Sequence, residues 1–174
     1  MTEDNKFVLR PSSLTELSDN PFLWYKKHIL NQSAFNGNHN TVLGTLLHAR
    51  IENIYNGLET NQDDEFAYLE LHKEVITDSW LLLAELDDLW NAWLEDYYPH
   101  NPRPTQTEFN ISFEPIDGIL FQGTVDALIG NDTIVDWKST TKTKSSIGDY
   151  WMQLYMYAII ARANGYNINK IRVV

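Results

Sequence analysis

The hydrophobic pattern of the chain changes near residue 105, and this change limits the folds available to it. Up to residue 100, apolar residues recur at steps of three and four, as in Leu82, Leu86 and Leu89, which predicts amphipathic helices. From residue 107, apolar residues such as Phe109 and Ile111 alternate with polar ones, which is typical of strands. We therefore expect a helical part followed by a sheet.

The expected elements follow this division. We expect a short helix that ends at Leu17 and begins at a cap on Ser12 or Ser13. Further helices are expected at 22–30, 42–55, 78–97 and 148–163, and a weaker helical pattern is found at 66–76. Strands are expected at 107–115, 119–129, 133–137 and 171–174. The segments 32–40 and 60–65 are expected to be loops. Helices, then a meander of strands, then a helix and a strand predict an α/β domain with a mixed sheet and helices on its faces.

Length and composition narrow the class of protein. The chain has 174 residues, which suggests one domain over 1–174, with a mainly helical part at 1–100 and a sheet core with its following helix at 101–174. It has no cysteine, which excludes disulfides and an iron–sulfur cluster held by cysteine. We find no secretory signal and no apolar run long enough to span a membrane, so we expect a cytoplasmic protein without membrane contact.

The charge is unevenly distributed. The net charge of −11 argues at first against a nucleic-acid partner, because such affinity depends largely on neutralised phosphates. However, residues 51–100 hold thirteen acids and one base, whereas residues 137–174 hold six bases and one acid. Most of the acidity therefore belongs to one helical segment, and the overall charge does not exclude DNA.

Two carboxylates and a lysine are predicted to converge on the strands. Asp136 and Lys138 are two residues apart, so on a strand they share a face. A short turn near Asn131 would bring Asp126 opposite residues 134–138 in an antiparallel pair. Two carboxylates can bind Mg²⁺ or Mn²⁺, and a lysine can stabilise charge on a phosphate. A surface turn with ordinary salt bridges would give the same three residues.

Two pairs of polar residues lie at helical spacing. His48 and Glu52 are four residues apart in one expected helix, and Gln153 and Tyr157 are four apart in another. Each pair therefore shares a helix face. His48 could equally be an ordinary surface or core histidine, and Gln153 and Tyr157 could form only the polar edge of a packed helix.

Taken in chain order, these residues resemble a known family. The motifs are G-x-x-x-H-x-x-x-E at 44–52, G-x-x-D at 123–126, D-x-K at 136–138 and Q-x-x-x-Y at 153–157. This set resembles the RecB-type branch of the PD-(D/E)XK nuclease superfamily, which includes the RecB and AddB nuclease domains, CRISPR adaptation nucleases and phage exonucleases. The segment SSLTELSDNPFLWYKKHIL at 12–30 is also similar to the N-terminal helical segment of that branch.

The resemblance implies roles for particular residues. Asp126 and Asp136 would ligate Mg²⁺ or Mn²⁺, with the backbone carbonyl of Trp137 and a nitrogen of His48 as further ligands. Lys138 would position the attacking water. The expected catalytic residues are therefore Asp126, Asp136 and Lys138.

Other residues receive supporting roles. Gln153 and Tyr157 would contact the nucleic acid, as would Lys142 and Lys144 in the Ser/Thr-rich loop after the D-x-K motif. Candidates for a second metal, or for contacts behind the ligands, are Glu52 and Glu108.

The resemblance implies a restriction-endonuclease-like fold and a metal-dependent deoxyribonuclease. Exonuclease or end-processing action on single strands or duplex ends is expected, in recombination, repair, phage replication or defence, in a bacterial or phage-encoded protein. A non-catalytic or partner-dependent nucleic-acid-binding subunit is the alternative, although its site would be expected to lose one of the three catalytic residues. A protein partner could dock on the acidic segment 59–96 or complete the sheet at the C-terminal strand.

Overall fold

We describe a computed structural model of the chain, which covers residues 6–32, 37–139 and 150–174. The chain forms two compact units. The first, called here the sheet unit, comprises Met1–Ala34, Thr105–Asp136 and Lys142–Val174. The second, called the helical unit, comprises Phe35–Pro104 and Trp137–Thr141.

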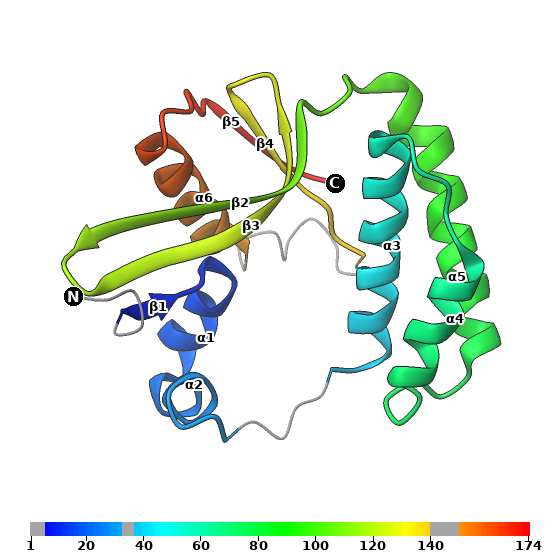
Figure 1. The fold of residues 1–174 in the computed structure, drawn as a ribbon, viewed down its shortest axis with the longest axis horizontal. Coiled ribbons are helices and arrows are strands. Elements are labelled where there is room, and N and C mark those ends of the chain that lie inside the picture. The colour runs from blue at the N-terminus through cyan, green and yellow to red at the C-terminus, as the bar shows by residue number, and fades with distance from the viewer. Residues whose placement is uncertain (1–5, 33–36, 140–149) are drawn as a thin grey trace. The chain divides into compact units, whose positions relative to one another are not determined.

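The elements of both units can be followed along the chain in Figure 1. The sheet unit contains β1 (Phe7–Leu9), the 3-10 turn η2 (Pro11–Ser13), α1 (Leu14–Asp19), α2 (Pro21–His28), β2 (Gln106–Ile116), β3 (Ile119–Ile129), β4 (Thr133–Asp136), α6 (Trp151–Ala163) and β5 (Lys170–Val173). The helical unit contains α3 (His39–Asn56), α4 (Gln62–Leu71), α5 (Ser79–Ala92), the π-helical turn η3 (Trp93–Tyr97) and the 3-10 turn η4 (Tyr98–His100).

The sheet is mixed and is centred on β3. Its path runs β1-β3-β4-β5, and β2 also pairs with β3. The pairs β2–β3 and β3–β4 are antiparallel, whereas β1–β3 and β4–β5 are parallel. The three predicted meander strands are therefore confirmed. No pattern in the sequence predicts β1, which has only three residues.

The long β2–β3 hairpin is the main feature of the sheet in Figure 1. Asp117 and Gly118 form its turn, and Gly118 has a φ of 81°, which glycine adopts without steric cost. The Nζ atom of Lys6 is 2.6 Å from a carboxylate oxygen of Glu114 near this turn. The hairpin fixes the register that aligns the polar residues described below.

Helix α6 packs against the sheet through its apolar side. Leu154, Ile160 and Ala161 of α6 are fully buried with Val125 and Ile134 of the strands. Residues at three- and four-residue steps along α6 face this core. One side of α6 is therefore fixed against the sheet, which orients its remaining polar residues.

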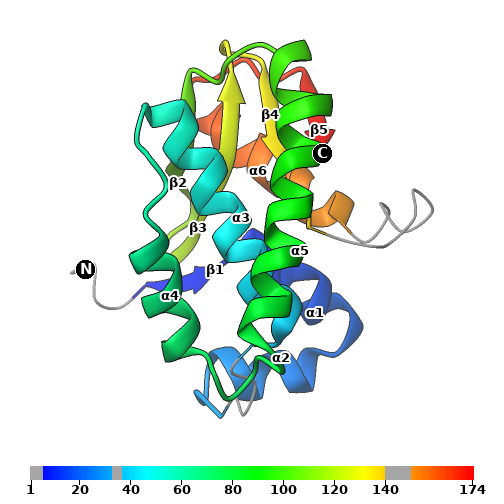
Figure 2. The same ribbon diagram turned by 90° about the vertical axis from the view of Figure 1, so that its right-hand side faces the viewer.

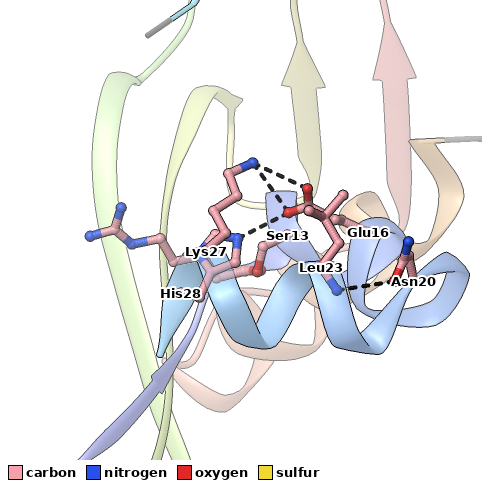
Figure 3. A network of polar contacts seen from close by, with 7 residues as sticks. Ser13, Glu16, Asn20, Leu23, Lys27 and His28 are labelled. Atoms are coloured by element: carbon pink, nitrogen blue, oxygen red, sulfur yellow. Dashed lines mark hydrogen bonds and ion pairs between the residues drawn. The ribbon is translucent and has the colours of Figure 1, made fainter. Parts of the chain in front are cut away.

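The N-terminal helices α1 and α2 form a hairpin held by a polar network, shown in Figure 3. Asn20 ends α1 and caps α2, where its side chain accepts a hydrogen bond from the backbone N–H of Leu23. Glu16 accepts hydrogen bonds from Lys27 at 3.2 Å and lies 3.1 Å from Nε2 of His28. Ser13 is the N-cap residue of α1, as expected, but its hydroxyl donates to the Arg10 carbonyl and accepts no hydrogen bond from the helix.

A cluster of charged residues joins α3, α4 and α5 of the helical unit, the helices shown in Figure 2. Arg50 of α3 donates to both carboxylate oxygens of Glu65 on α4, at 2.6 and 2.9 Å, and to Asp87 on α5 at 2.7 Å. Arg50 and Glu65 are both 7% exposed. Helix α3 ends as predicted at Gly57, whose φ is 71°.

Several predicted boundaries are wrong. The segment at 60–65 was expected to be a loop, but α4 begins at Gln62, where the Asn61 side chain caps the helix. The third strand was expected to include Trp137, but β4 ends at Asp136. The α-helical part of the segment at 78–97 ends at Ala92 and continues as a π-helical turn. Within the residues that the structure covers, no helix is long and apolar enough to cross a membrane.

Candidate functional site

The two aspartates of the strands lie opposite each other. In the β3–β4 pair, Ala127 faces Val135 and Leu128 faces Ile134. Continuing this antiparallel register by one residue places Asp126 opposite Asp136, as the sequence predicted. Asp136 is only 2% exposed, whereas Asp126 is half-buried. A carboxylate as buried as Asp136 is costly unless donors or cations surround it.

Glu108 joins these carboxylates from the neighbouring strand. Thr107 faces Ala127 and Phe109 faces Val125, so Glu108 lies opposite Asp126. A carboxylate oxygen of Glu108 and one of Asp126 lie within 4.8 Å of each other. Glu108 has a φ of 45°, a left-handed conformation inside a strand. Such a backbone costs of order 1–3 kcal/mol and tends to occur at functional sites.

The inner face of α6 lies against the same carboxylates. Tyr157 is buried, and its hydroxyl accepts a hydrogen bond from the Gln153 side chain at 3.3 Å. Burial, together with the negative charges of Asp126, Asp136 and Glu108, raises the pKa of Tyr157 to about 12. The structure thus brings the Q-x-x-x-Y pair beside the strand carboxylates.

Gly123 explains how α6 approaches the strand so closely. A Cβ atom at this position would lie 2.8 Å from the ring of Tyr157 and 3.1 Å from Pro11. Contacts shorter than 3.0 Å are not tolerated without movement, and here the neighbours are an aromatic ring and a proline ring. The glycine of the G-x-x-D motif is therefore required by packing and lets Tyr157 lie next to β3.

The helical unit contains the histidine motif and the residues that follow β4. Nε2 of His48 lies 2.8 Å from the backbone carbonyl oxygen of Trp137, and the two rings meet edge to face. Trp137 is buried and stacks on Tyr55, with ring centroids 6.1 Å apart. A Cβ atom at Gly44 would lie 2.8 Å from the Ser139 hydroxyl oxygen. The G-x-x-x-H motif of α3 therefore binds the backbone just after Asp136.

The remaining predicted site residues differ in burial and in their contacts, and two of them cannot be placed. Lys138 directly follows this buried tryptophan and is half-buried. Glu52 shares α3 with His48, but within the described residues it forms no ion pair or side-chain hydrogen bond. Lys142 and Lys144 lie outside the described residues.

The donor groups in each unit suit a divalent cation. In the sheet unit, the carboxylates of Asp126, Asp136 and Glu108 all lie near Tyr157, and carboxylate oxygens are the ligands that Mg²⁺ and Mn²⁺ favour. In the helical unit, the His48 nitrogen and the Trp137 carbonyl oxygen are 2.8 Å apart. Neighbouring ligands of an octahedral ion, each at about 2.1 Å, are separated by about 3 Å. Both atoms could therefore bind one ion.

Comparison with known proteins identifies the class. The model of a family described as the PD-(D/E)XK nuclease superfamily matches residues 9–173. The chain therefore belongs to the PD-(D/E)XK nuclease superfamily, and its mixed sheet with helices is the restriction-endonuclease-like fold that the sequence predicted.

Among solved structures, the fold is similar to a protein of Eubacterium rectale that is described as a candidate exonuclease. The TM-score is 0.67 at 16% sequence identity, and the match covers 98% of this chain and 69% of that one. At this identity the similarity concerns the fold alone. A comparison with curated proteins found no match.

Proposed function

We propose that this nuclease is a divalent-metal-dependent deoxyribonuclease of the RecB-type branch that hydrolyses phosphodiester bonds. The observation that carries the proposal is the pairing of Asp126 opposite Asp136 in the β3–β4 register, with Lys138 two residues further along the chain. We further propose exonuclease or end-processing action on single strands or duplex ends, in recombination, repair, phage replication or defence.

The proposed metal ligands are oxygen atoms and one nitrogen. Asp126, Asp136 and the carbonyl of Trp137 would hold Mg²⁺ or Mn²⁺, with His48 as the nitrogen ligand. The closeness of Glu108 to Asp126 makes it a further ligand candidate. When bound, such an ion polarises a phosphoryl oxygen and eases the ionisation of a water molecule.

The other polar residues would contact the attacking water and the substrate. The Lys138 ammonium group would orient the attacking water and offset the charge that develops on the phosphate. The Tyr157 hydroxyl is protonated at neutral pH, like that of any tyrosine, and is therefore available as a hydrogen-bond donor. With Gln153 it would brace the site or contact the nucleic acid, and Lys142 and Lys144 would contact phosphates nearby.

Support for a protein partner comes from the helical unit. We propose that the acidic segment 59–96 docks a basic partner, because its surface exposes Trp80 and Leu71 at 74% and 81%. Exposed apolar residues within a charged surface are typical of interaction sites. The edge strand β5 is a second place where another strand could extend the sheet.

A cleavage assay tests the nuclease proposal. Single- and double-stranded DNA, labelled at the 5′ or 3′ end, would be incubated with the protein and Mg²⁺ or Mn²⁺. We expect cleavage by the wild type and a loss of at least about 100-fold in D126A and K138A, since each residue acts directly on the reacting groups. Asp117→Ala is the matched control, because Asp117 is an exposed aspartate in the turn at the far end of the same hairpin.

The possible outcomes separate the hypotheses. Cleavage that survives both D126A and K138A would contradict the site assignment. If no substrate is cleaved although calorimetry shows that Mn²⁺ still binds, the result would favour the alternative function, a nucleic-acid-binding subunit of a larger complex. Weaker Mn²⁺ binding in D136N and E108Q, with D117A unchanged, would support the proposed ligands.

A further inference from the structure

The outer face of α6 carries an exposed row of large side chains. Trp151, Tyr155 and Ile159 follow one another at four-residue steps, so they share a face of the helix. Their exposed fractions are 44%, 59% and 49%. The rings of Trp151 and Tyr155 have centroids 5.6 Å apart and are tilted by 33°. Tyr157 is buried on the other side of the helix, so this row is separate from the candidate active site.

A cavity lies beside this row, between α6 and the start of β5, which are neighbours in Figure 1. Its volume is about 370 Å³, within the range of about 300–1,000 Å³ that is usual for ligand pockets. Its lining includes the aromatic side chains of Trp151 and Tyr155 and the cations of Arg162 and Lys170. The size and lining suit a planar ring together with an anionic group.

The cations of this cavity are available to an external anion. The Arg162 guanidinium donates to the backbone carbonyl of Ile168, at 2.9 Å from Nε, which holds it at the cavity wall. Within the described part of the chain, neither Arg162 nor Lys170 has a carboxylate partner. Both side chains are exposed, in a protein whose net charge is −11. This surface is therefore a positively charged region of an acidic molecule.

We propose that the Trp151–Tyr155 face and its cavity bind single-stranded nucleic acid. Bases would stack on Trp151 and Tyr155, and the adjoining phosphates would contact Arg162 and Lys170. Aromatic side chains interleaved with cations form the usual platform for single strands, because every base offers a flat face for stacking. The proposal extends the proposed nuclease function, on which it rests, by adding a surface that holds the strand away from the reacting phosphate.

The charge of this face favours an anionic strand with flat bases over an apolar protein surface. A purely apolar partner would bury Trp151 and Ile159, but it would also remove Arg162 and Lys170 from water without supplying a counter-charge, which is unfavourable. A strand supplies both flat bases and phosphates at close spacing. A second copy of this chain is an outcome that the experiment below can distinguish.

A binding assay in EDTA tests this surface apart from catalysis. Fluorescein-labelled oligo(dT) would be titrated with the wild type, Trp151→Ala, Tyr155→Ala and Lys170→Gln, with tryptophan quenching as a second signal. We expect each aromatic substitution to weaken binding at least about fivefold, since stacking on one ring typically contributes that much. Trp151→Phe should retain most of the affinity, which controls for damage to α6. Trp80→Ala is the matched control, because it removes a more exposed tryptophan from the acidic segment.

Cleavage assays then separate this proposal from the nuclease proposal. Trp151→Ala should slow cleavage of long single strands more than that of short ones, whereas Asp126→Ala should abolish both and leave binding in EDTA intact. Unchanged oligo(dT) binding in Trp151→Ala and Tyr155→Ala would overturn the proposed surface, even if the nuclease activity is confirmed. A change in oligomeric state by light scattering, with DNA binding unchanged, would also overturn it and identify an interface between copies.

Discussion

Gly123 and Gly44 are single residues at which the structure predicts different effects of the same substitution to alanine. Gly123→Ala would place a Cβ atom 2.8 Å from the Tyr157 ring and 3.1 Å from Pro11. We expect a loss of about 1–3 kcal/mol in the free energy of unfolding, because neither ring can move without disturbing the core. Urea denaturation measures this loss.

Gly44→Ala is the matched control. Its Cβ atom would meet only the Ser139 hydroxyl, which can rotate away, and alanine favours the helix over glycine by about 1 kcal/mol. We therefore expect unchanged or slightly increased stability in urea. Equal losses in the two variants would contradict the packing that we assign to the G-x-x-D motif.

Tyr157 should give stability a particular dependence on pH. Burial raises its pKa from about 10 in the unfolded chain to about 12 in the folded one. Its contribution is therefore complete below pH 10 and is lost as the pH rises from 10 to 12, by about 2–3 kcal/mol in total. Tyr157→Phe should lose stability less steeply than the wild type across this interval in denaturant titrations. Parallel curves for the two proteins would show that Tyr157 titrates normally.

The sequence was most informative for residues whose roles follow from spacing. The pairing of Asp126 with Asp136 could be predicted, because the length of a turn sets the register of an antiparallel pair. The left-handed backbone of Glu108 could not, since no local pattern marks it. The approach of His48 to the Trp137 carbonyl was implied by the family resemblance alone, because residue spacing does not show how α3 packs against a distant segment.

Among whole elements, the three helices of the helical unit depend on one buried charge cluster. In Arg50→Ala, the carboxylate of Glu65 would remain buried without its cation, which typically costs about 3–5 kcal/mol. We expect a loss of that size in urea or thermal denaturation. The double variant R50M/E65L should recover most of it, because it removes both charges together. A double variant as unstable as the single one would indicate that Arg50 acts through packing alone.

Errors in the predicted elements have identifiable causes. The polar residues Asp63, Asp64 and Glu65 at the start of α4 are typical of a loop, yet Asn61 caps this helix and acids in its first turn favour the helix dipole. The cap and the acids are visible in the sequence, but a polar composition alone does not distinguish a loop from a capped helix start. Strand β1, by contrast, has three residues and is defined by its parallel pairing with β3. A strand this short carries no periodicity that could reveal it.

At the scale of the whole molecule, the net charge of −11 predicts weak and moderately salt-dependent DNA binding. If about two cations contact phosphates, the logarithm of the affinity for single strands should fall with the logarithm of salt with a slope of about −1.4. Titrations of oligo(dT) in EDTA at several salt concentrations measure this slope. Lys170→Gln should make it shallower by about 0.7. A slope several times steeper would mean that a much larger cationic surface is involved.

The expectation of a single domain over 1–174 stays a prediction. The chain forms two compact units, and the D-x-K motif crosses their boundary, with Asp136 in the sheet unit and Lys138 in the helical unit. Hydrophobic patterning could locate the helices and strands of both units. It could not show that residues 137–141 would join the helical unit, because that assignment rests on contacts of Trp137 with His48 and Tyr55.

The left-handed backbone of Glu108 has a consequence for how this sequence can vary. Glycine or asparagine would adopt that conformation at lower cost. Glu108 therefore lowers the folding stability of the chain but keeps a carboxylate beside Asp126. In a library of variants selected only for soluble expression, glycine and asparagine should become more frequent at position 108. Under selection for DNA cleavage, it should return to an acid.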